Sequence, residues 1–173
     1  VNFIVHPSNT RLEADVRASV EEKVPFVITS LGAVKLVVDA VHSYGGKVFH
    51  DITTRRPAEK AVAAGVDGLI LVTAGAGGHA GTANPFALIA EIRQFFAGPI
   101  ALSGALSNGA QVAAAIAAGA DFAYMGTRFI ATQESRAAEN YRAMIQNSGI
   151  GDIVYTPAIS GIPANFLAES LRR

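Results

Sequence analysis

The sequence predicts a single α/β domain built on a parallel sheet. Short apolar runs alternate along the chain with stretches of helical periodicity, which is typical of parallel strands joined by right-handed crossover helices. Half of the 173 residues are hydrophobic and only 16% are charged, as expected for strands that are covered on both faces. No linker is visible, so we expect residues 1–173 to form one domain.

Six apolar runs of strand length carry the predicted sheet. They span residues 2–5, 25–29, 47–51, 68–73, 99–103 and 121–125. The helical stretches between them span residues 9–22, 33–44, 55–64, 84–97 and 107–118, and an amphipathic stretch over residues 134–147 follows the last strand. We expect residues 148–173 to form a tail after the sheet.

An internal repeat indicates how the units are built. Residues 61–67 (AVAAGVD) resemble residues 115–121 (AIAAGAD). Each copy ends a helix with Gly, which adopts the left-handed C-cap conformation, and then starts a buried strand at or just after Asp. Barrels repeat such βα units, but a complete barrel has eight strands. Two interpretations follow: a barrel without its first two βα units, or an open doubly wound sheet.

Composition disfavours several functional classes. The 14 basic and 14 acidic residues balance, and no basic stripe is present, so we expect no nucleic-acid partner. The chain lacks cysteine, which excludes disulfides and thiolate chemistry, and no cluster of His, Asp and Glu has metal-ligand spacing. No apolar run reaches the roughly 18 residues of a membrane helix, and the first residues do not resemble a signal peptide. We therefore expect a cytoplasmic protein without membrane contact.

A glycine-rich loop carries the strongest local signal. Residues 73–81 (TAGAGGHAG) directly follow an apolar run, and their glycines allow a ligand to approach the backbone closely. His79 would then lie at the carboxyl end of a parallel strand, where barrel active sites form, and imidazole titrates near neutral pH. We favour this catalytic interpretation over a flexible turn with a surface histidine.

Two further loops indicate an anion site. Residues 103–109 (SGALSNG) and 124–129 (YMGTRF) each follow a predicted strand. Asn108, with Gln111 three residues later, resembles a helix N-terminal cap. Loops of small residues that precede helix N-termini bind phosphate through backbone N–H groups, and two consecutive units commonly share one phosphate. Asp51, at the end of another strand, either faces the same region or caps the helix that follows.

Together these segments resemble the nitronate monooxygenase (2-nitropropane dioxygenase-like) family of FMN-dependent TIM barrels. Residues 1–5 resemble its third strand, residues 76–81 its histidine loop, residues 103–105 and 125–129 its flavin-phosphate loops, and residues 160–165 a segment after its barrel. The resemblance favours the barrel, with strands 3 to 8 of the (β/α)8 fold present here. Flavin-dependent enoyl and quinone reductases share these loops, so the reaction stays open.

The resemblance implies non-covalent FMN. Its phosphate would lie on the N–H groups of Gly104, Ala105, Gly126 and Thr127, with Tyr124 and Met125 lining the same strand end. Asn2, Val72, Gly77 and Gly78 would surround the isoalloxazine or the ribityl chain, and His79 would lie near the reactive edge. Ala105 stands where the family usually has a second Gly, and Val72 stands where many members have Gln.

Three functions follow from this resemblance. The first is oxidation of alkyl nitronates with O2 to carbonyl compounds and nitrite, with His79 binding the nitro group or taking the α-proton. The second is an NAD(P)H-dependent flavin reductase that acts on an enoyl thioester or a quinone. The third is a truncated barrel without enzymatic activity, which would assemble as a homo-oligomer or remain inert because its sheet edges are exposed.

Overall fold

The computed structural model describes residues 1–32 and 35–172, and it confirms the parallel α/β fold. Six strands form one sheet in the order β1-β2-β3-β4-β6-β7, and every neighbouring pair is parallel. The strands are β1 (Asn2–Ile4), β2 (Phe26–Ser30), β3 (Lys47–Ile52), β4 (Gly68–Val72), β6 (Ile100–Ser103) and β7 (Phe122–Ala123). The helices between them are α1 (Leu12–Glu21), α2 (Lys35–His42), α3 (Arg55–Ala63), α4 (Pro85–Arg93) and α5 (Gly109–Ala117).

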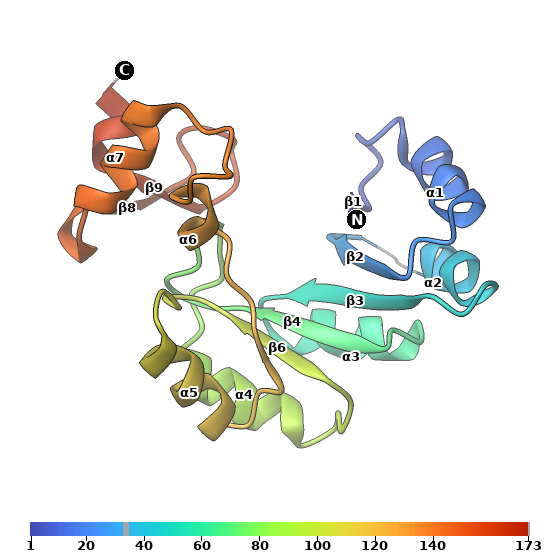
Figure 1. Ribbon diagram of the computed structural model, residues 1–173. Helices are drawn as coiled ribbons and strands as arrows, with labels where there is room; N and C mark the ends of the chain where they lie inside the picture. The colour runs from blue at the N-terminus through green and yellow to red at the C-terminus, as the bar shows by residue number, and fades with distance from the viewer. Residues whose placement is uncertain (33–34, 173) are drawn as a thin grey trace.

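The strand order decides between the two predicted architectures. The six strands follow one another around the sheet in sequence order, whereas a doubly wound sheet reverses its order at a switch point. The sheet curves, and the helices cover its convex side (Figure 1). It is therefore an arc of a barrel with six of the eight strands that a closed (β/α) barrel contains.

The main core lies between the sheet and the helices. Val27, Val48, Leu69 and Ile100 are fully buried at the outer face of the sheet, and helix residues such as Ile92 pack against them. Burial of a side chain of this size contributes about 1.5–3 kcal/mol. Most of the apolar packing therefore involves this one face.

The concave inner face is more open. Phe49, Ile70 and Ala101 form a small separate cluster there, and the ring of Phe49 lies 4.9 Å from that of Phe26 and 6.5 Å from that of Phe122. Phe26 is nevertheless 41% exposed and Phe122 is 53% exposed. The inner face thus exposes apolar side chains, whereas helices cover those of the outer face.

The repeated Asp has one structural role in both units. A side-chain oxygen of Asp67 accepts the N–H of Val48 at 2.8 Å, and Asp121 accepts the N–H of Ile100 at the same distance. In each case the N–H of the Asp donates back to the carbonyl of the same partner. Each Asp thereby joins the start of its own strand to the start of the preceding one. The internal repeat is therefore a strand-pairing device at the amino ends of the sheet.

Several predicted boundaries move. β7 ends at Ala123, so Tyr124 and Met125 lie in the connection to a short helix, α6 (Thr127–Ile130). Helix α1 begins at residue 12 and not at 9, because Asn9 forms a local turn in which its side chain binds the backbone on both sides. Helix α7 (Glu139–Asn147) begins later than the predicted residue 134. The first residues of the predicted helix 33–44 lie outside the described residues.

The C-terminal segment is more than a tail. It contains the 3-10 helix η1 (Ile150–Asp152), strands β8 (Ile153–Thr156) and β9 (Ala164–Leu167), and the 3-10 helix η2 (Ala168–Arg172). Strand β9 pairs with β8 and also with a two-residue strand, β5 (Gly78–His79), within the glycine-rich loop. The sequence did not predict this antiparallel sheet. None of the described helices is long and apolar enough to cross a membrane.

Candidate active site

Three loops meet at the carboxyl ends of β4, β6 and β7. The N–H of Ala105, after β6, donates to the carbonyl of Gly75, after β4, at 3.0 Å. A Cβ added to Gly77 would overlap the side-chain oxygen of Thr127, which follows β7. Only glycine allows these backbones to lie so close together. The sequence predicted that the three loops belong to one site, and the structure brings them together.

The loop after β6 has an unusual backbone. Gly104 has a φ of +143° and Ala105 a φ of +54°, a region that residues with a Cβ rarely adopt. A Cβ on Gly104 would overlap the Thr73 side-chain oxygen and lie 2.9 Å from the carbonyl of Ala74. The N–H of Ala105 is engaged by Gly75, which differs from its expected use as a phosphate donor. The second glycine of the family is thus replaced by a strained Ala that ties two loops together.

The helix after this loop begins with the predicted cap. The side chain of Asn108 accepts the N–H of Gln111 at 3.1 Å, and Oε1 of Gln111 accepts the N–H of Asn108 at 3.1 Å. Oε1 of Gln111 also accepts the N–H of Ser107 at 2.6 Å. This capping box stabilises the start of α5, but it occupies amides that an anion would otherwise use.

The loop after β7 offers more open donors. Gly126 precedes the short helix α6, and a Cβ at this position would meet nothing within 4 Å. The first N–H groups of a helix have no partner inside it. No hydrogen bond donated by the N–H of Gly126 or Thr127 occurs among the described residues, so these amides are candidate anion donors of this region.

His79 is exposed and is held by the C-terminal segment. Its Nε2 lies 3.1 Å from the hydroxyl of Ser160, and its backbone pairs with Ala164 of β9. The hydroxyl of Tyr155 donates to the carbonyl of Ala80 at 3.1 Å, and the amide of Asn165 donates to the carbonyl of Ala76 at 2.7 Å. The histidine loop is therefore a fixed strand and not a flexible turn.

These anchoring residues were missed from the sequence. Ser160 and Asn165 lie in the segment 160–165 that resembles the family's post-barrel region, and the sequence assigns neither residue to the site. A possible signal was present, because polar side chains with turn-forming neighbours (SGIPAN) sat near the end of a largely apolar chain. Nothing in that signal indicated which loop they would bind.

A polar group occupies the inner face at β1, β2 and β3. The hydroxyl of Ser30 lies 2.7 Å from Oδ2 of Asp51 and 3.2 Å from Oδ1 of Asn2. Oδ1 of Asp51 is buried and has no hydrogen-bond partner among the described residues. Asp51 therefore faces the concave side and does not cap α3, whose N-cap is Thr54.

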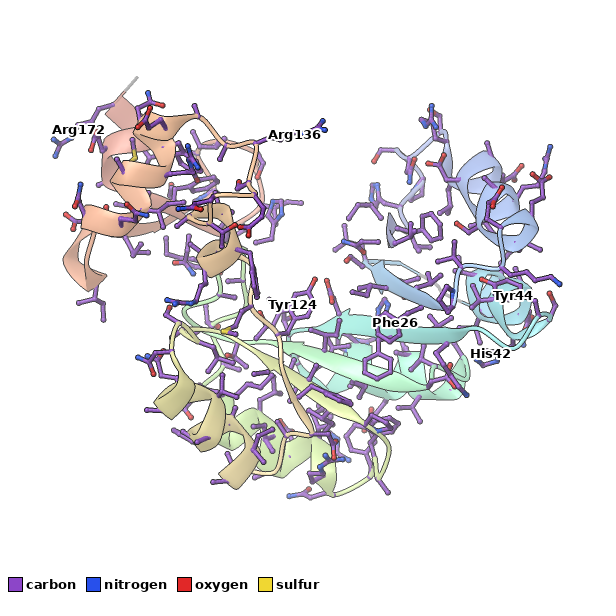
Figure 2. All side chains as sticks on the ribbon, in the orientation of Figure 1. Phe26, His42, Tyr44, Tyr124, Arg136 and Arg172 are labelled. Carbon is purple, nitrogen blue, oxygen red and sulfur yellow. The ribbon has the colours of Figure 1, made fainter. Side chains whose placement is uncertain are left out.

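Burial shifts the pKa values of Asp51 and Tyr124 on the inner face. Burial raises the pKa of Asp51, and the hydrogen bond from Ser30 only partly offsets that effect. The pKa of Tyr124 is also raised, first by burial and then by the nearby charge of Asp51. Tyr124 lies on the concave side, where the chain leaves the sheet toward α6 (Figure 2). The inner face thus brings an acidic and a phenolic group to the ends of the strands.

The other histidines lie elsewhere. His50 is buried on the outer face, where its Nδ1 lies 2.8 Å from the hydroxyl of Thr29, and burial lowers its pKa to about 4. His42 lies at the opposite end of the sheet from Tyr124 (Figure 2), and its Nε2 lies 2.7 Å from Oδ2 of Asp67. The imidazole of His6 lies 2.8 Å from the hydroxyl of the nearby Ser8 and accepts its N–H. His79 is thus the histidine that lies within the glycine-rich loop after β4.

Comparison with known proteins places the chain in a family. Residues 6–173 match the family model described as nitronate monooxygenase. The chain is 32% identical over 143 residues to a nitronate monooxygenase of Paraburkholderia phytofirmans, a match that covers 78% of this chain and 39% of that protein. It is 26% identical over 159 residues to a hydroxy-methyl-oxo-octahydroindene-carboxyl-CoA dehydrogenase of Mycobacterium tuberculosis, covering 90% of this chain and 45% of that protein.

Solved structures give the same fold. The structure of FabK from Thermotoga maritima superposes with a TM-score of 0.86 and 33% identity, over 96% of this chain and 53% of that one. A nitroalkane oxidase from Streptomyces ansochromogenes superposes with a TM-score of 0.81 and 29% identity, over 90% of this chain and 48% of that one. The chain spans about half the length of these structures and less than half that of the two sequence relatives. The matched fold, the shared loops and the family model over residues 6–173 show that this chain belongs to the nitronate monooxygenase family, whose members are flavin-dependent oxidoreductases.

Proposed function

We propose that this chain forms the FMN-binding part of an oxidoreductase that oxidises alkyl nitronates with O2 to carbonyl compounds and nitrite. The observation that carries the proposal is the contact between the histidine loop and the loop after β7, where Gly77 meets Thr127. This contact brings an exposed, anchored imidazole next to backbone amides suited to a phosphate. The proposed catalytic group, His79, and the proposed phosphate donors would then lie at the same rim, formed by the loops after β4, β6 and β7.

The residues present fit FMN at this rim. Amides of Gly126 and Thr127 would hold the phosphate, with Gly104 beside them, while Tyr124 and Met125 would line the adjoining strand end. Asn2 and Val72 would face the ring from the concave side, where apolar and polar side chains are both accessible. The buried oxygen of Asp51 without a partner supports a bound group in this region.

His79 would handle the substrate and its proton. Bound FMN would supply the redox chemistry between the nitronate and O2. The imidazole would bind the nitro group, or would take the α-proton when the neutral nitroalkane enters. The hydrogen bond to Ser160 would hold one ring nitrogen so that the other faces the substrate.

A second candidate is a flavin-dependent oxidoreductase for a CoA thioester. Two similar proteins, from Mycobacterium tuberculosis and Rhodococcus jostii, are dehydrogenases of a carboxyl-CoA compound and match 90% and 88% of this chain. Val72 stands where many nitronate monooxygenases carry Gln, so a side-chain hydrogen bond to the flavin would be missing at this position. An NAD(P)H-dependent enoyl or quinone reductase belongs to the same class of reaction.

One spectroscopic experiment separates these functions. The visible absorption of the purified chain, reconstituted with FMN, is recorded before and after anaerobic addition of propyl nitronate and, separately, of NADH. Bleaching by the nitronate alone supports the monooxygenase. Bleaching by NADH alone supports the reductase, and failure to bind FMN at all would favour the inert or oligomeric fragment.

The His79→Asn variant tests the proposed role of the imidazole. We expect it to retain FMN but to lose turnover of neutral nitroalkanes by about 10²–10⁴-fold, the usual contribution of a positioned general base. His6→Asn, which alters another exposed histidine, serves as the matched control. Turnover unchanged in His79→Asn would remove His79 from the mechanism.

A further inference from the structure

A chain of three polar side chains crosses the inner face from β3 to β1. Asp51 contacts Ser30 at 2.7 Å, and Ser30 contacts Asn2 at 3.2 Å. Asp51 and Ser30 are largely shielded from solvent, whereas Asn2 is exposed. The chain therefore leads from a shielded carboxyl group to a side chain that a ligand on the concave side would touch.

Counting hydrogens shows that the two contacts depend on one proton. The hydroxyl of Ser30 carries a single hydrogen, yet it faces a carboxyl oxygen of Asp51 and the amide oxygen of Asn2, which are both acceptors. With Oδ1 of Asn2 facing Ser30, as in the structure, both contacts are hydrogen bonds only when Asp51 carries a proton and donates it to Ser30. When Asp51 is ionised, Ser30 donates to Asp51 and the Asn2 amide must turn so that its Nδ2 donates to Ser30.

The surroundings of Asp51 favour the protonated form. Its other oxygen, Oδ1, is buried and has no hydrogen-bond partner among the described residues, and burial raises the pKa of the carboxyl group. Tyr124, from the end of β7, is the titratable group whose pKa responds to the charge of Asp51. The adjacent His50 faces the helices on the other side of the sheet.

We propose that Asp51 is a positioning residue whose proton sets the hydrogen-bond polarity that Asn2 presents to the ligand of the concave face. With the proton on Asp51, Asn2 offers its two N–H donors and suits a ring with hydrogen-bond acceptors. Without that proton, Asn2 offers its oxygen and suits a donor. The proposal rests on the proposed function for the identity of the ligand, FMN, but the switch itself belongs to the chain.

Nuclear magnetic resonance of the side-chain amide of Asn2 tests the switch without cofactor. The Asn2 NH2 signals of the whole chain are followed from about pH 8 to about pH 4, a range that lies just above the ordinary Asp pKa of about 3.9. We expect them to shift with one titration step. In Asp51→Asn, whose amide donates to Ser30 at every pH, they should stay at the low-pH position of the unaltered protein.

Two further variants keep the test decisive. Ser30→Ala removes the hydroxyl that links Asp51 to Asn2, so the Asn2 signals of this variant should lose the titration step. Asp39→Asn removes an exposed carboxylate that pairs with Lys35 on α2, and its Asn2 signals should titrate as in the unaltered protein. Asn2 signals that are constant in the unaltered chain, or that titrate equally in Asp51→Asn or Ser30→Ala, would overturn the proposal.

Binding of FMN separates this inference from the proposed function. We expect FMN to bind about fivefold more tightly when Asp51 is protonated, which is the gain of about one hydrogen bond, and the pH dependence should vanish in Asp51→Asn. A switching Asn2 without FMN binding at any pH would leave the inference standing and defeat the proposed function. FMN binding with a pH profile unchanged in Asp51→Asn would overturn the inference and leave the proposed function standing.

Discussion

Two neighbouring residues of β3, His50 and Asp51, lie on opposite faces of the sheet and have different environments. His50 points to the outer face, is 5% exposed and binds Thr29 between the strands and the helices. Asp51 points to the inner face and binds Ser30 with one oxygen only. Burial disfavours the charged form of both, so it lowers the pKa of His50 and raises that of Asp51. On the outer face Nδ1 of His50 is paired, whereas on the inner face Oδ1 of Asp51 has no hydrogen-bond partner among the described residues and apolar rings are exposed.

This difference indicates a division of roles between the outer and the inner face of the sheet. The outer face combines complete burial with helix packing, which is the main source of folding free energy. The inner face keeps polar atoms and apolar surface available, at a cost in stability that a bound group would offset. The predictions below test that division, from the largest expected effect to the smallest.

Truncation of adjacent residues on the two faces should give unequal losses. Leu71 is fully buried on the outer face, so Leu71→Ala should lower the free energy of unfolding by about 2–5 kcal/mol. Val72 is only partly buried on the inner face, so Val72→Ala should cost about 1 kcal/mol or less. Urea unfolding measures both, and equal losses would contradict the division.

Acid should weaken the fold through His50. Its pKa is about 4 in the folded chain against an ordinary 6.5, so the unfolded chain binds more protons between these values. The stabilisation is present above about pH 6.5 and is lost as the pH falls to about 4, by about 3 kcal/mol in total. His50→Gln should flatten this acid dependence in denaturant unfolding at a series of pH values. An unaltered slope in this variant would assign the acid sensitivity to other groups.

Asp51 should act in the opposite direction and more weakly. Its pKa is raised in the folded chain, so the folded state binds more protons than the unfolded state just above the ordinary carboxyl value. Stability from this group therefore rises as the pH falls through that range. Asp51→Asn removes the gain and should steepen the acid loss in the same unfolding series, whereas a shallower loss would refute the assigned direction.

The anchoring of the histidine loop should show a small, local effect. Tyr155→Phe removes the hydrogen bond to the carbonyl of Ala80 and should cost about 0.5–1.5 kcal/mol. Hydrogen exchange should become faster at Gly78 and His79 while β4 stays protected. Tyr141→Phe, on α7 and outside these contacts, is the matched control; faster exchange throughout the sheet would mean that the effect is not local.

Much of the fold followed from local patterns. The alternation of apolar runs and helices, the capping box of Asn108 with Gln111 and the repeated Asp all depend on contacts that the sequence itself displays at short range or by repetition. The histidine loop and the two anion loops were also found, because glycines after a buried strand are conspicuous.

The missed features depend on long-range contacts. Strand β5 has two residues, so it shows no alternation, and its partner Asn165 lies 87 residues farther along the chain. The side of Asp51 was undecided because β3 is largely buried on both faces and period-two patterning does not name the inner one. The N–H of Ala105 donates a hydrogen bond to the carbonyl of Gly75 in another loop, and the local sequence does not reveal this contact.

The pairing of His79 with Ala164 has a consequence for synthesis on the ribosome. The barrel arc and all three loops of the rim leave the ribosome before β9 does, and folding of a nascent chain follows that order. The imidazole therefore gains its fixed position only when the final stretch of this sequence emerges. A nascent chain that already carries the proposed phosphate amides would still lack the contacts of His79 with β9, so the site proposed here would be complete only after translation had passed β9.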